Sequence, residues 1–154
     1  MRHAPFAPAL YSALALAACG GEAPPPAPAP AVTAPARAGI PFSEPRVAVT
    51  RDGLYRLSWA PVGGFVPVNE HFELEVTVTK NDAAATPVEG GAVVVDCQMP
   101  DHGHGMLREP RSEDLGGGKH KVRGLLLHMG GHWTMALSVL VDGVASTADD
   151  SIDL

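Results

Sequence analysis

Residues 97–106 concentrate side chains that bind metal ions. They read Cys-Gln-Met-Pro-Asp-His-Gly-His-Gly-Met, which places one thiol, two thioethers and two imidazoles within ten positions. If this stretch is extended, His102 and His104 project to the same side about 7 Å apart at the backbone, so both imidazoles can converge on one ion. Met99 and Met106 add a thioether on either side of the histidine pair.

The types of donor in this stretch favour copper over other metals. Thioether combined with imidazole suits Cu(I) and, less exclusively, Cu(II). Zinc would prefer cysteine thiolates or a third histidine, whereas calcium and magnesium need a cluster of oxygen ligands. Asp101 is the only carboxylate in the stretch. A copper ion is therefore the cofactor that this set of donors fits best.

A second segment with the same donor types follows at residues 128–132, where the sequence reads His-Met-Gly-Gly-His. It lies at an expected strand end and turn, and sites in β-sandwiches are assembled from separate loops that meet at one end. We expect His128, Met129 and His132 to supply further ligands. The imidazoles of the first stretch should then lie within about 4–5 Å of a third His or Met donor.

Several of these side chains also have a structural interpretation. Met99 is as well suited to filling the core as to binding a metal, since a flexible thioether packs against aromatic edges. Cys97 follows the alternation of a strand, which favours a buried, inert thiol over a ligand, and Met135 is expected in the core. His71 and His120 occupy polar positions and are expected in solvent.

The N-terminal residues resemble an export signal. An apolar run from about residue 7 to residue 18 is too short to cross a membrane, which takes roughly 20 residues. Leu16-Ala17-Ala18-Cys19 resembles the bacterial lipoprotein box, which implies diacylation of Cys19 and a stable membrane anchor. The alternative is an ordinary cleaved signal. Gly20 stands where many inner-membrane lipoproteins have aspartate, so outer-membrane anchoring facing the periplasm is favoured.

The chain divides into three parts on this reading. Residues 1–18 are the signal peptide, and residues 19–39 are the lipidated cysteine with a Pro/Ala-rich linker, which proline keeps extended. Residues 40–154 are the folded domain. Lipidation of Cys19 leaves Cys97 without a disulfide partner. The formal net charge of −6 argues against nucleic acid as a partner.

The folded part has the period-two pattern of antiparallel strands. Apolar and polar residues alternate strictly over residues 72–78. The same period places Trp133, Met135, Leu137, Val139 and Val141 on one side, and a weaker alternation covers residues 55–59. Further strands are expected over residues 46–50, 91–97 and 120–128, and turn residues bound them. No segment has a helical stripe. We therefore predict an all-β, antiparallel immunoglobulin-like β-sandwich of about seven strands.

Two motifs in this region resemble the YtkA-like domain family of small exported bacterial proteins. They are Met-Pro-Asp-His-Gly-His-Gly at residues 99–105 and Met-Gly-Gly-His-Trp at residues 129–133, with Gly130 where many relatives have proline. The resemblance covers about residues 69–143. It implies a β-sandwich and a link to copper handling and cytochrome oxidase biogenesis.

Two classes of function follow from these patterns. The first is a lipid-anchored periplasmic accessory protein that binds copper and passes it to a membrane-bound acceptor. The second is an immunoglobulin-like interaction module on a Pro-rich stalk, in which the histidines only bond loop carbonyls. An enzyme is not expected, because the sequence has no H-E-x-x-H, G-x-S-x-G or phosphate-binding motif.

Overall fold

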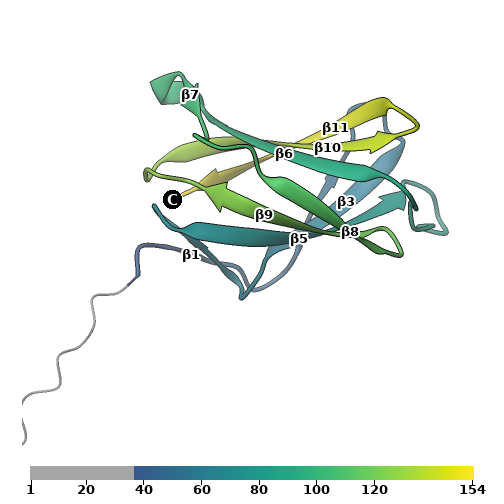
Figure 1. Cartoon of the computed structure of the whole chain (residues 1–154), viewed down its shortest axis with the longest axis horizontal. Coiled ribbons are helices and arrows are strands. Elements are labelled where there is room, and N and C mark those ends of the chain that lie inside the picture. The colour runs from purple at the N-terminus through teal and green to yellow at the C-terminus, as the bar shows by residue number, and fades with distance from the viewer. Residues whose placement is uncertain (1–36) are drawn as a thin grey trace, which may run out of the picture. The chain divides into compact units, whose positions relative to one another are not determined.

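The computed structural model describes residues 37–154, which form a nearly all-β domain (Figure 1). The predictions for the signal peptide, for Cys19 and for most of the linker lie outside the described residues. None of the helices in residues 37–154 has the length and hydropathy needed to cross a membrane. The elements in chain order are β1 (Gly39–Pro41), β2 (Arg46–Val49), β3 (Tyr55–Pro61), β4 (Phe65–Pro67), β5 (His71–Lys80), β6 (Ala92–Met99), the 3-10 helix η1 (Pro100–His102), β7 (His104–Gly105), β8 (Arg111–Gly116), β9 (Lys119–Leu126), β10 (His132–Val141) and β11 (Val144–Asp153).

Two antiparallel sheets form the layers of a sandwich, as Figure 1 shows. One sheet has the strand order β2-β3-β5-β9-β8 and the other β11-β10-β6-β7, while β1 and β4 form a separate pair. The orders β3-β5-β9-β8 and β6-β10-β11 reproduce the two sheets of an immunoglobulin constant-type domain. The predicted immunoglobulin-like sandwich of seven strands is therefore confirmed, and β1, β2, β4 and β7 are short additions to it.

Alternating residues of both sheets build the core. In β5 and β10 every second residue is buried, as the period-two pattern predicts. Leu74, Trp133 and Leu137 have no exposed surface. Each fully buried aliphatic side chain of this size contributes about 1.5–3 kcal/mol of hydrophobic stabilisation. Strands β8 and β11 were not recognised from the sequence, because every residue of β8 is exposed and β11 is mostly polar.

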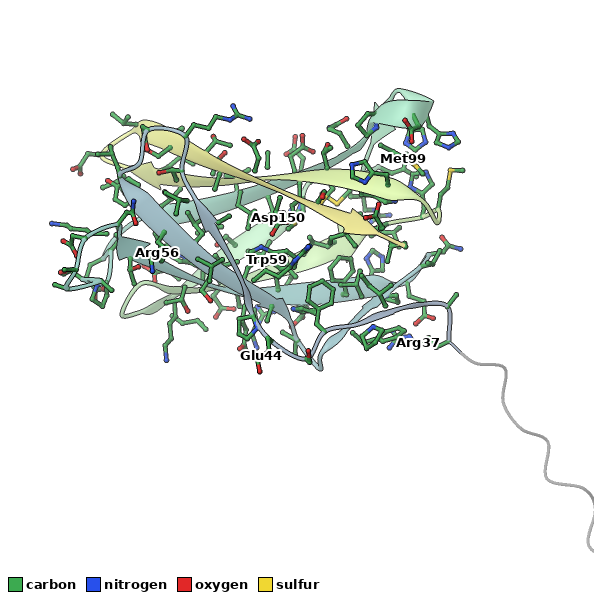
Figure 2. All side chains as sticks on the ribbon, turned by 180° about the vertical axis from the view of Figure 1, so that it is seen from behind. Arg37, Glu44, Arg56, Trp59, Met99 and Asp150 are labelled. Carbon is green, nitrogen blue, oxygen red and sulfur yellow. The ribbon has the colours of Figure 1, made fainter. Side chains whose placement is uncertain are left out.

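A polar contact connects the two layers on the side of β2 and β11. The indole N–H of Trp59 on β3 donates to Asp150 Oδ2 on β11 at 2.9 Å. Figure 2 shows these two labelled side chains near the middle of the sandwich. Arg46 of β2 lies 3.3 Å from the other oxygen of Asp150 and stacks over the Trp59 ring at 5.6 Å. The buried indole thereby keeps a hydrogen-bond partner, and β11 is held against β2 and β3.

A β-bulge at Gly124 decides which residues of β9 face the core. Phe72 pairs with Leu125 but the next residue, Glu73, pairs with Arg123, so Gly124 is an extra residue with a φ of 87°. An extra residue shifts the inward-facing positions by one. His120 is consequently buried, with 2% of its surface exposed. The expectation that His120 is solvated was wrong, whereas His71 is exposed as expected.

A carboxylate joins the turn between β2 and β3 to the start of β11. Asp52 accepts hydrogen bonds from Thr50 Oγ1 and Ser146 Oγ, both at 2.6 Å. Those two hydrogen bonds, with Ser146 contributing most, hold the pKa of Asp52 below its ordinary value. The folded chain therefore stabilises the charged form of Asp52 more than the unfolded chain does.

This linkage predicts a loss of stability in acid. The folded pKa of Asp52 is lowered, so its contribution is present above the unfolded value of 3.8 and is lost as the pH falls through the folded pKa. We expect Asp52→Ala to lower Tm at neutral pH, and the difference from wild type to shrink below about pH 4. Thermal unfolding followed by circular dichroism from neutral pH to about pH 3 measures this. Asp82→Asn, an exposed control, should leave Tm unchanged; a constant Asp52→Ala difference at all pH values would contradict the linkage.

Candidate metal site

The His-Gly-His stretch is a tight turn between β6 and β7. Pro100 starts η1, which ends at Gly103 in the left-handed conformation with a φ of 65°. The chain then returns as β7, where His104 pairs with Met99 of β6. The stretch is therefore not extended between Pro100 and Gly103, so the condition on which His102 and His104 would project to the same side is not met. Proline at the first helical position and glycine at the left-handed position both favour this turn.

Three imidazoles lie together at this end of the sandwich, those of His102, His104 and His128, and are called the ring group below. The ring centroids of His102 and His104 are 5.8 Å apart, and those of His104 and His128 are 4.9 Å apart. His128 comes from the connection between β9 and β10, so the second donor segment lies beside the first. Figure 2 shows this end of the molecule, where the labelled Met99 lies below the turn.

Trp133 packs against two of these three imidazoles. Its ring meets those of His104 and His128 edge to face, with centroids 5.9 Å and 5.5 Å away. Trp133 is fully buried, and its indole N–H donates to the carbonyl of Met129 at 3.0 Å. That hydrogen bond holds the β9–β10 connection over the end of the sandwich, which places His128 against His104.

The half-buried imidazoles of His104 and His128 each have a nitrogen atom without a hydrogen-bond partner. Nδ1 of His104 and Nδ1 of His128 are both buried and have no hydrogen-bond partner. A buried polar atom without a partner costs about 1–3 kcal/mol. A metal–nitrogen bond of about 2.0 Å places a ring centroid roughly 3.2 Å from the ion, so two rings that share an ion have centroids up to roughly 6.4 Å apart. Both centroid separations in the group fall within this reach.

The methionine donors occupy different environments. Met99 is 2% exposed, and its methyl group lies so close to Gly131 that a Cβ there would meet it at 2.5 Å. Met106 is partly buried against the core, and its backbone N–H donates to the carbonyl of Cys97. Met129 is 37% exposed. Of the three methionines, Met129, the neighbour of His128 in the sequence, is the most exposed.

His132 faces away from the core on β10, next to the inward-facing Trp133. Its Nδ1 lies 2.7 Å from Oδ1 of Asp153, the residue opposite it on β11. The structure thus places His132 in a surface contact with Asp153. Sequence reasoning missed Asp153, because 21 residues separate the pair and nothing in the local pattern marks it.

Cys97 belongs to the core, as its phase in β6 predicts. It is 1% exposed, and burial, with a smaller contribution from Asp96, raises the pKa of its thiol to about 12. The sulfur is therefore a neutral thiol near neutral pH, not the thiolate that binds metals or attacks substrates. Met135 is also buried, with 1% exposed.

The donors are grouped but do not form a complete centre. Within residues 37–154 no three His, Cys, Asp or Glu side chains are already arranged to hold a metal ion. Comparisons with protein-family models, with curated proteins and with solved structures give no match to this chain. The resemblance to the YtkA-like family therefore stays a prediction based on the two motifs.

The burial of Cys97 predicts that it is chemically inert in the folded protein. We expect iodoacetamide to leave Cys97 unmodified under native conditions and to modify it after unfolding in guanidinium, because only the exposed thiolate reacts. Mass spectrometry of the peptide that contains Cys97 measures the extent of alkylation. Rapid native modification would show instead that β6 opens or that the thiol is ionised.

Proposed function

We propose that this protein binds a copper ion between His104 and His128, with His102 as a third donor. The observation that carries the proposal is the pair of half-buried imidazoles, whose ring centroids are 4.9 Å apart. Each of the two has a buried Nδ1 without a hydrogen-bond partner. Coordination by a metal would satisfy such a nitrogen at a site where the fold leaves it unsatisfied.

Three imidazoles alone suit zinc as well as copper, and the soft thioether of Met129 is the donor that favours copper. Carboxylates do not contribute to the ring group, and the nearest thiol in sequence, Cys97, is buried and protonated. The remaining donors are imidazoles and the exposed thioether of Met129. This combination of ligands suits Cu(I), which accepts few and soft ligands.

The exposure of the donors suits delivery of the ion rather than permanent retention. His104 and His128 are half-buried, whereas His102 and Met129 are exposed. An acceptor protein can approach an ion from the exposed side and replace one ligand at a time. With the lipid anchor proposed at Cys19 and the linker proposed for residues 19–39, the domain would deliver copper to a membrane-bound acceptor from the periplasmic side.

A structural role is the second candidate. The edge-to-face packing of His104 and His128 on Trp133 is itself stabilising, since such aromatic pairs contribute about 0.5–1.5 kcal/mol beyond their buried area. In that case the histidines only close one end of an interaction module. The two functions differ in whether copper stabilises the fold.

The test is a thermal shift with copper. A ligand that binds only the folded state stabilises it by about 2.7 kcal/mol at a hundredfold excess over Kd, so Tm of the full chain should rise by several degrees with Cu(I). We expect His104→Ala combined with His128→Ala to abolish this shift while the protein without metal still unfolds cooperatively. Differential scanning calorimetry under reducing conditions measures both quantities.

Two single variants make the test specific. His71→Ala removes an exposed histidine outside the ring group and should keep the full shift. His132→Ala should also keep it, because His132 contacts Asp153 instead. Absence of a shift in the wild-type chain would favour the structural role, and a shift that persists in the double variant would place the ion elsewhere.

A further inference from the structure

A second polar site lies on the outer side of β8 and β9. It is a pocket of about 610 Å³ whose lining includes Arg108, Arg111, Arg123 and His71, together with Glu109 and Glu113. The side chains come from three places in the sequence: the start of β5, the connection from β7 to β8, and the β8–β9 hairpin. Three guanidinium groups thus gather around one cavity in a protein whose net charge is −6.

The charged side chains at this pocket are unevenly paired. Arg123 pairs with Glu113 and lies 3.3 Å from Glu73, so its charge is neutralised and its position is held. Arg108 and Arg111 form no ion pair with any residue in the part of the chain that the structure describes. Glu109 is the only other carboxylate of the lining. With Glu73 counted, three carboxylates face three guanidinium groups, but Glu73 and Glu113 both lie on Arg123, so the guanidinium groups of Arg108 and Arg111 are left without an ion-pair partner within residues 37–154.

The register of the hairpin brings two of these cations together. Arg111 on β8 is directly opposite Arg123 on β9, and both are exposed. Residues directly opposite each other in an antiparallel pair have Cβ atoms about 4.5–5.5 Å apart, so one small anion can reach both guanidinium groups. An anion bound between the two guanidinium groups would give Arg111 the partner that Glu73 and Glu113 already give Arg123.

The backbone leaves room for such an anion. Gly124 follows Arg123 at the β-bulge, and a Cβ built on it would meet no atom within 4 Å. The absence of a side chain there keeps this part of the pocket open. Ser112 also borders the pocket. Guanidinium groups present a planar fork of N–H donors, which matches the oxygen spacing of carboxylates and phosphates.

We infer that this pocket is a binding site for a small oxyanion, namely a phosphate or a carboxylate group. Arg108 and Arg111 supply guanidinium groups that have no ion-pair partner among the described residues. Arg123 supplies a third guanidinium group, which Glu73 and Glu113 hold in position. The inference is independent of the copper proposal, since no histidine of the ring group lines the pocket.

An NMR titration tests the inference. Inorganic phosphate and citrate are each added to the full ¹⁵N-labelled chain at constant ionic strength, with chloride as the reference anion. We expect saturable shifts of the Ser112 and Gly124 amide signals with at least one of the two oxyanions and none with chloride. A response to phosphate alone or to citrate alone supports the site and identifies which group it prefers.

Matched variants locate the site. Arg108→Gln and Arg111→Gln should each weaken binding by about tenfold, because each removes a charged hydrogen-bond donor. Arg56→Gln is the control: Arg56 is exposed, bonds Asn81, and lies at the other end of the molecule from Met99 in Figure 2. Absence of saturable shifts with both oxyanions, or equal weakening by Arg56→Gln, would overturn the inference. His104→Ala should leave oxyanion binding unchanged.

Discussion

The geometry of the candidate metal site depends on the burial of one side chain, Trp133. Its ring is fully buried at the end of the sandwich, and a buried indole N–H needs a hydrogen-bond acceptor. The acceptor is the carbonyl of Met129 in the preceding connection. Because this bond draws the β9–β10 connection across the end of the sandwich, His128 contacts His104, and both imidazoles rest on the indole.

The unsatisfied polar atoms of the domain are all imidazole nitrogens. In residues 37–154 the buried side-chain nitrogen and oxygen atoms without a partner belong to His104, His120 and His128. Two of these histidines, His104 and His128, meet at the candidate metal site. His120 instead lies within the sheet, and its burial lowers its pKa, so it is neutral near neutral pH. The two unsatisfied nitrogens of His120 thus lie away from the candidate site, and those of His104 and His128 lie within it.

Sequence patterns predicted the fold where burial and residue type agree. The inward residues of β5 and β10 are large and apolar, so their alternation is visible in the sequence. β8 is fully exposed and has no such signal. At the end of β9 and just after it, the buried positions are odd-numbered, at Leu125 and Leu127. The bulge at Gly124 reverses this, and His120 is buried as a result. A bulge depends on pairing with β5, which a local pattern does not contain.

The sequence by itself determined the types of donor, their division into two segments and the strands that carry them. Only the tertiary structure decided which donors meet. Adjacent residues of a strand point to opposite faces, so Trp133 enters the core while His132 turns outward to Asp153. Met99, the last residue of β6, is buried beneath the turn, whereas His104 lies on β7 and contacts His128. Contact between donors from separate segments is set by strand pairing and loop closure, which depend on the whole fold.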